Sequence, residues 1–243
     1  MGEPLVAKFF VYDKDDLAYY SAKYTAQALI AAVAKNGRAS LAVSGGSTRH
    51  MLEMLANNSR DFGVPWGSVW LFFVDERLVP PSHEDSNYKM VKQALIDKVE
   101  LPGCQVFRIR GELEPAEAAK QYCDHIREYF GGEPRFDILQ LGMGEDGHTA
   151  SLFPNTLGLE EEEDAAVANY IARGFWRVTL TKAAINSAAN VFFLVSGGSK
   201  AQVLKRVLEG PLDEKELPAQ LVSPPSGLAY FLDKEAASLL EIK

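Results

Sequence analysis

The segment SLAVSGGSTRHMLEMLA, Ser40–Ala56, contains a pattern that indicates the class of the fold. A mostly apolar run, Ser40–Val43, leads through Gly45 and Gly46 into Thr48–Ala56, where apolar residues recur at helical spacing. A short apolar run, a glycine turn and a helix are the first parts of a βαβ unit, in which a parallel strand follows the helix. The segment therefore predicts a parallel sheet.

The same alternation continues along the chain, and repeated βαβ units of this kind are typical of an α/β protein with a mostly parallel sheet. The predicted strands are Ser40–Val43, Val69–Val74, Val106–Ile109, Phe136–Leu141, Arg177–Leu180, Val191–Val195 and Leu228–Leu232. The predicted helices are Asp15–Lys35, Thr48–Ala56, Tyr88–Val99, Pro115–Tyr129, Lys200–Glu209 and Lys234–Leu240. No Ser- or Pro-rich linker interrupts this order, so we expect a single domain over residues 1–243.

Composition restricts the classes of partner. The 25 basic and 33 acidic residues give a net charge of −8, which argues against nucleic acid or an anionic membrane as the main partner. Cys104 and Cys123 fit no metal-binding spacing and are too few for a disulfide framework, which favours a reducing compartment. No signal region or membrane-length apolar run is present, so we expect a cytosolic protein. The acidic run Glu160–Glu163 is expected on a solvated surface.

A charged triplet follows the apolar strand in LFFVDERLV, Leu71–Val79. Ligands of open parallel sheets bind at the carboxyl ends of strands, so Asp75, Glu76 and Arg77 are expected at the mouth of a site. The alternative is that these side chains cap neighbouring loops or pair with each other. Charges directly after a buried strand are costly unless they are used or well paired, which favours the site.

The most specific segment is FDILQLGMGEDGHTASLFP, Phe136–Pro154. Its strand ends in glycines, and His148 follows two residues after Asp146. A histidine beside a carboxylate at the end of a strand has the ingredients of an oriented general base. An unperturbed imidazole titrates at about 6.5 and is available as the neutral base near neutral pH. A lone histidine is more often structural, and the neighbouring loops raise the catalytic interpretation above that alternative.

The first glycine turn offers backbone N–H groups at the start of a helix. Gly45 and Gly46 allow close approach of an anion, and Ser47 and Thr48 open the helix. The segment is neither a P-loop nor a dinucleotide motif. It therefore predicts a phosphate site or an ordinary strand-to-helix turn, with about equal weight.

Two further segments supply cations. Lys200 opens a helix after Gly197 and Gly198, so its ammonium and the helix start can face one anion. An exposed lysine is usually only solvated, and the glycine pair is what favours the ligand interpretation. Arg177 begins the strand RVTLT, Arg177–Thr181.

Together these segments resemble the 6-phosphogluconolactonase family over about Ser40 to Ala237. The resemblance is carried by SGGST (Ser44–Thr48), DERLVP (Asp75–Pro80) with Ser86-Asn87, GMGEDGHTASLFP (Gly142–Pro154), RVTLT (Arg177–Thr181), SGGSKAQVL (Ser196–Leu204), LPAQLV (Leu217–Val222) and GLAYFLDKEAA (Gly227–Ala237). The chain differs at ARGFW, Ala172–Trp176, where relatives often have a proline, and this leaves the role of Arg173 open.

The resemblance implies a Rossmann-like, three-layer α/β fold shared with sugar-phosphate isomerases and deaminases. It implies hydrolysis of 6-phospho-D-glucono-1,5-lactone to 6-phosphogluconate in the pentose phosphate pathway, with no metal or coenzyme. His148 falls at the family's proposed catalytic histidine, and the SGGST loop, Arg77 and Lys200 fall where the anionic substrate would be handled. The expected partner is thus a small phosphorylated sugar lactone, and we expect a monomer or weak dimer.

A mechanism follows as a hypothesis. His148 takes a proton from the attacking water, while Asp146 or Asp75 orients the imidazole. Backbone N–H groups of a glycine turn, with Arg77, stabilise the oxyanion. A covalent route through Ser44, Ser47 or Ser151 is less attractive because the GxSxG elbow is missing.

Two other functions stay open at this point. The first is a glucosamine-6-phosphate deaminase or isomerase, although such enzymes typically have DEY-like and DGHIAFNEP-like segments where this chain has DERLV and DGHTASLFP. The second is a non-catalytic sugar-phosphate-binding protein on the same fold, since fold does not fix function.

Overall fold

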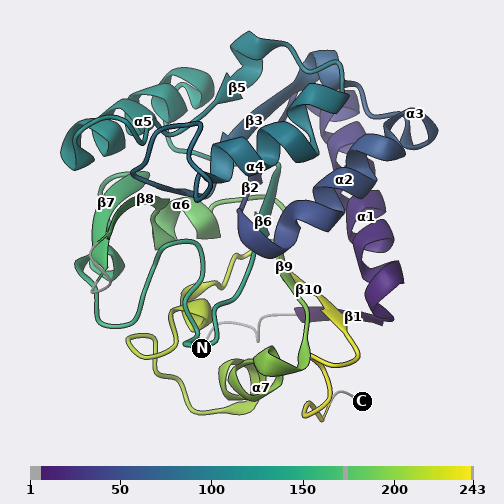
Figure 1. The fold of residues 1–243 in the computed structure, drawn as a ribbon, viewed down its shortest axis with the longest axis vertical. Coiled ribbons are helices and arrows are strands. Elements are labelled where there is room, and N and C mark those ends of the chain that lie inside the picture. Colours follow the sequence, from purple (N-terminus) through teal and green to yellow (C-terminus); the bar gives the residue numbers. More distant parts are fainter. Residues whose placement is uncertain (1–6, 172–174, 242–243) are drawn as a thin grey trace.

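A computed structural model describes residues 7–171 and 175–241 of the chain. Its centre is a seven-stranded sheet with the order β1-β10-β9-β6-β2-β3-β5, in which every neighbouring pair is parallel (Figure 1). The strands are β1 (Ala7–Tyr12), β2 (Ala39–Val43), β3 (Val69–Phe73), β5 (Val106–Phe107), β6 (Ile138–Leu141), β9 (Val191–Val195) and β10 (Leu228–Asp233). The sheet confirms the predicted α/β class.

Helices flank this sheet. They are α1 (Lys14–Asn36), α2 (Arg49–Asn57), α3 (Ser59–Phe62), α4 (Asn87–Ala94), α5 (Pro115–Phe130), α6 (Lys182–Asn186) and α7 (Ala201–Glu209). Helices α1, α2 and α4 pack side by side on one face of the sheet, and α5 and α7 lie on the opposite face. The result is the expected three-layer arrangement.

Local chemistry explains where the elements lie. All residues of β2, β6 and β9 are buried, as expected for strands covered by helices on both faces. Helix α5 begins with Pro115, and both α1 and α5 end at glycines in the left-handed region, Gly37 (φ 75°) and Gly131 (φ 72°).

A second, three-stranded antiparallel sheet stands beside the first, with the order β4-β8-β7. Its strands are β4 (Asp75–Arg77), β7 (Ala166–Ile171) and β8 (Phe175–Leu180), and α5 packs against β7 and β8 (Figure 1). Val74 joins the two sheets: its N–H donates to Val43 O at 2.9 Å, and its carbonyl accepts from Leu180 N at 2.8 Å. The chain therefore leaves the parallel sheet at Val74 and enters the small sheet as β4.

Most of the predicted elements are confirmed, but the structure also differs from the prediction at several places. Strands β1, β4 and β7 were not predicted, and Arg177–Leu180 lies in the antiparallel sheet as part of β8. The predicted helix Tyr88–Val99 is regular only over α4 and continues as a 3₁₀ turn, Ile96–Lys98.

The predicted helix Lys234–Leu240 is wrong, because this segment forms consecutive turns. The Asp233 carboxylate accepts from Ala236 N at 2.7 Å and from Gly197 N at 2.8 Å. Tertiary anchoring of so short a segment outweighs helix nucleation, which is unfavourable for a single turn.

Other expectations can be compared with the described residues. Glu160–Glu163 lies in a largely exposed loop before β7, as predicted. Cys104 and Cys123 are free thiols, and Arg173 lies outside the described residues. Within the described ranges, no helix is long and apolar enough to cross a membrane.

Candidate active site

A cavity of about 260 Å³ lies where the loops after β2, β6 and β9 meet the small sheet. Strand order reverses between β2 and β6, so this is the switch point at which open α/β sheets bind ligands. The cavity is lined by Ser44, Gly45, Gly46, Ser47, Asp75, Arg77, Asn87, Gly142, Met143, Gly144, His148, Ala150, Arg177 and Lys200. Eight of the ten predicted site residues are in this lining, and Thr48 and Asp146 are not.

The glycine loop after β2 forms one wall. Gly46 has φ 67°, and a Cβ on Gly45 would come within 1.9 Å of Asn87 Oδ1, so both positions need glycine. Ser47 is exposed beside the cavity. Thr48 instead is fully buried, and its hydroxyl donates to Gln140 Oε1 at 2.9 Å. Thr48 thus supports the loop from behind.

His148 is held by the turn that follows β6. Its Nδ1 lies 2.5 Å from Asp146 Oδ1, which also accepts from His148 N at 3.2 Å. The hydrogen bond with His148 lowers the pKa of Asp146 to about 2, so this carboxylate is ionised at neutral pH. A carboxylate partner at Nδ1 places the imidazole proton there and leaves the Nε2 lone pair to accept a proton.

Glycine makes room for this histidine. A Cβ on Gly144 would lie 2.1 Å from His148 Nδ1, and Gly147 has φ 82°. Gly144 N also donates to His148 O at 2.8 Å, which closes the turn. Glycine is therefore needed at both positions: at Gly144 to leave space for the imidazole, and at Gly147 for the left-handed backbone conformation.

Asp75 has different partners from Asp146. It is 5% exposed, and its Oδ2 accepts from Ser151 Oγ at 2.5 Å. Asn87 Nδ2 donates to Asp75 O at 2.8 Å and to Oδ1 at 3.2 Å, and Arg177 Nη1 lies 3.8 Å from Oδ2. Of the two carboxylates considered as partners of His148, Asp146 is the one in contact with the imidazole.

Three cations face the same cavity. Arg77 and Arg177 lie directly opposite each other in the β4–β8 register, and Lys200 completes the group. Arg77 Nη1 donates to Asp85 O at 3.0 Å and to Asn87 Oδ1. Like charges in directly opposed positions are unfavourable unless an anion offsets them. With Asp75 as the single carboxylate of the lining, the charge of this wall suits an anion.

Glu76 does not lie at the mouth of the site, contrary to the expectation. It is 2% exposed, and its Oε1 accepts from Arg77 N at 2.7 Å and Asn87 N at 2.8 Å. Its Oε2 accepts from Ser86 Oγ at 3.0 Å and Tyr88 N at 2.8 Å. Burial raises the pKa of Glu76, and the backbone hydrogen bonds oppose that rise. Glu76 thus fixes the backbone that carries Arg77 and Asn87.

Some residues of the site were missed by sequence reasoning. Asn87 was noted within a motif but was not assigned a role, although it contacts both Asp75 and Arg77. Ala150 lines the cavity with φ 52°, a left-handed backbone that its sequence does not signal. Phe153 stacks on the His148 ring, with centroids 4.0 Å apart.

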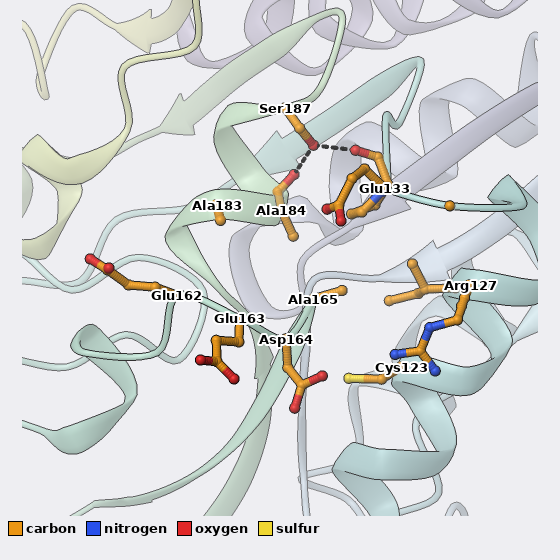
Figure 2. Close-up of a pocket in the computed structure, with 13 residues that line it drawn as sticks. Cys123, Arg127, Glu133, Glu162, Glu163, Asp164, Ala165, Ala183, Ala184 and Ser187 are labelled. Atoms are coloured by element: carbon orange, nitrogen blue, oxygen red, sulfur yellow. Dashed lines mark hydrogen bonds between the residues drawn. The ribbon is translucent and has the colours of Figure 1, made fainter.

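A second pocket, of about 100 Å³, lies between α5, α6 and the segment before β7 (Figure 2). Cys123 and Arg127 of α5 face Glu163 and Asp164, and the Ser187 hydroxyl donates to the carbonyls of Pro134 and Ala184. The charged residues of its lining are mainly acidic, which disfavours an anion. Among the described residues, no group of three or more His, Cys, Asp or Glu side chains could hold a metal ion.

The chain is an α/β protein whose candidate site, the first cavity, places a histidine that is paired with a carboxylate beside three cations. A family model described as glucosamine-6-phosphate isomerases/6-phosphogluconolactonase matches residues 12–231. The chain belongs to this family.

Two relatives illustrate the similarity. The chain is 42% identical to a human 6-phosphogluconolactonase over 215 residues, covering 84% of this chain and 82% of the relative. A 6-phosphogluconolactonase structure from Trypanosoma cruzi is similar with a TM-score of 0.84 and 27% identity, covering 99% of each chain.

The fold extends beyond lactonases. A monomeric glucosamine-6-phosphate deaminase has a TM-score of 0.81 at 20% identity, covering 96% of this chain and 100% of the deaminase. At that identity the likeness shows the shared fold alone, so function has to be argued from the site.

Substitution of Glu76 by Gln is expected to destabilise the protein. The new amide would direct an N–H₂ donor at groups that are themselves donors, at a cost of about 1–3 kcal/mol in unfolding free energy. Urea unfolding measures this loss, with exposed Glu84→Gln as the matched control, for which little change is expected. Equal midpoints for Glu76→Gln and wild type would show that the four hydrogen bonds do not stabilise the loop.

Asp146→Asn is expected to change the acid dependence of stability. The pKa of Asp146 is lowered from 3.8 to about 2, so the folded state favours the ionised carboxylate. This contribution is complete above pH 3.8 and is lost as the pH falls towards 2. The urea midpoints of wild type and variant should therefore converge as the pH falls from about 4 to about 2. A constant difference over that interval would contradict the assignment.

Proposed function

We propose that this protein hydrolyses 6-phospho-D-glucono-1,5-lactone to 6-phosphogluconate. The observation that carries the proposal is that His148, hydrogen-bonded to Asp146, lines the same cavity as Arg77, Arg177 and Lys200. A phosphorylated lactone needs both parts: a base for water and cations for the phosphate. The names of the relatives in the family support the same reaction.

His148 is the general base of the proposed reaction. Its Nε2 accepts a proton from a water molecule, which attacks the lactone carbonyl carbon C1. The ionised carboxylate of Asp146 accepts a hydrogen bond from Nδ1 of His148. It thereby fixes the tautomer of the imidazole and stabilises the imidazolium that forms. Protonated His148 then returns the proton to the ring oxygen as the C1–O bond breaks, so the base is regenerated.

The developing oxyanion requires donors. Backbone N–H groups of the glycine turns around the cavity, together with an arginine, supply them at typically about 3–4 kcal/mol per donor. The remaining cations and the N–H groups at Gly46 and Ser47 bind the phosphate. This division follows from distance along the substrate, because the carbonyl and the phosphate lie at opposite ends of a six-carbon chain.

The first test measures loss of the lactone, generated freshly from glucose 6-phosphate, after subtraction of spontaneous hydrolysis. Wild type should accelerate hydrolysis, and His148→Ala should lower kcat by about 10²- to 10⁴-fold, the usual contribution of a general base. His50→Ala is the matched control because His50 is exposed on α2, outside the cavity lining. Wild-type turnover by folded His148→Ala would remove this residue from the mechanism.

Parallel assays with other ligands distinguish the alternative functions. Release of ammonia from glucosamine 6-phosphate, with no acceleration of lactone hydrolysis, would identify a deaminase. Binding of 6-phosphogluconate without turnover of either substrate would identify a non-catalytic binding protein.

Arg177→Gln tests the cationic wall. Loss of one charge-assisted hydrogen bond of about 1.5 kcal/mol or more should raise KM for the lactone about tenfold, with a smaller effect on kcat. Arg60→Gln, at an exposed position on α3, serves as the control for loss of one positive charge. An unchanged KM in Arg177→Gln would place the phosphate elsewhere.

A further inference from the structure

The imidazole of His148 has an exposed partner. The Asp146 side chain is 48% exposed, and it contacts one ring atom, Nδ1. A single hydrogen bond at one atom leaves the ring free to tilt about that contact, and the direction of Nε2 would change with the tilt. A base that must aim at one water molecule needs a second restraint.

Phe153 supplies a planar surface against this ring. The centroids of the two rings are 4.0 Å apart and their planes differ by 22°, which is a stacked arrangement. The stack restrains the tilt that the hydrogen bond to Asp146 leaves open. Both Phe153 and His148 are partly buried, so their contact also keeps water from one face of the imidazole.

The backbone between His148 and Phe153 forms a tight turn that brings the two rings together. Thr149 and Leu152 form an isolated antiparallel bridge, with Leu152 N donating to Thr149 O at 2.9 Å. Ala150 adopts φ 52° within this turn, a conformation that is unfavourable for a residue with a Cβ. The reversal returns the chain to His148 five positions after it left, which places Phe153 over the imidazole.

Ser151 anchors the turn to the remainder of the site. Its Oγ donates to Asp75 Oδ2, its N–H donates to Thr179 Oγ1 at 3.1 Å, and its carbonyl accepts from Asn169 Nδ2 at 2.9 Å. All three partners are buried. The position of Phe153 is therefore determined by the small sheet, which also carries Arg77 and Arg177.

The same ring contacts a cation of the proposed phosphate wall. Arg177 Cζ lies 5.2 Å from the centroid of Phe153, within the range of a cation–π interaction. The ring thus touches both the proposed base and one of the arginines.

We infer that Phe153 is a positioning residue of the proposed hydrolysis, which fixes the plane of His148 and its separation from Arg177. This inference rests on the proposed function. It does not make Phe153 a catalytic residue, because the ring acts through His148 and Arg177 rather than on the substrate.

The test replaces Phe153 by Leu, which keeps an apolar side chain without a plane, and by Tyr, which keeps the ring. Phe153→Leu should lower kcat about tenfold or more, because small misplacements of a reacting group are costly. KM should stay within about twofold, since uniform binding is not removed. Phe153→Tyr should recover kcat to within about threefold of wild type. Phe62→Leu, the same change at a partly buried ring on α3, is the matched control.

A spectroscopic measurement makes the test independent of turnover. Stacking on Phe153 should shift the ring-proton NMR signals of His148 upfield in wild type, and these signals should move downfield in Phe153→Leu. If Phe153→Leu unfolds, Phe153→Met takes its place, and the same loss of kcat and the same downfield movement of the His148 signals are expected. Wild-type kcat in Phe153→Leu, with His148→Ala inactive, would overturn this inference and leave the proposed function intact. Full activity of His148→Ala would instead overturn the assigned base.

Discussion

The buried carboxylate of Asp75 is the group on which the geometry of the site depends. Removing a carboxylate from water is costly unless hydrogen bonds and opposite charge compensate for it. Ser151, Asn87 and Arg177 provide that compensation, and they come from the loop after β6, the start of α4 and strand β8. Satisfying one carboxylate therefore draws three separate segments to the edge of the parallel sheet. The turn that carries Ser151 is also the turn that follows His148.

Arg77 is held without a carboxylate partner among the contacts of the described residues. Arg77 donates to an amide oxygen and to a backbone carbonyl, both of which orient the guanidinium but carry no net charge. Arg177 and Lys200 each pair with one carboxylate at 3.8 Å, Arg177 with Asp75 and Lys200 with Glu145. In a chain with a net charge of −8, this arrangement concentrates positive potential at one cavity. This charge is consistent with the small phosphorylated substrate that we propose.

The sequence predicted the parts of the molecule that depend on local pattern. The buried strands and the strand-to-glycine turns were predicted because burial on both faces and positive φ leave clear signals in residue type. Strand β4 was missed because its three residues, Asp75–Arg77, are all charged and are paired only through tertiary register with β8. Side-chain direction was equally hidden: Thr48 and Glu76 belong to the correct motifs but point into the protein.

The glycines of the two site loops show why motif and mechanism are hard to separate by sequence alone. A glycine turn beside a phosphate site is usually explained by the approach of the ligand. Here a Cβ on Gly45 would collide with Asn87, and a Cβ on Gly144 would collide with His148. Both glycines therefore make space for a side chain of the protein itself, one that orients Arg77 and one that is the proposed base. The close packing of these side chains against bare backbone limits how far they can move towards it, so a larger residue at either glycine would displace a side chain of the site.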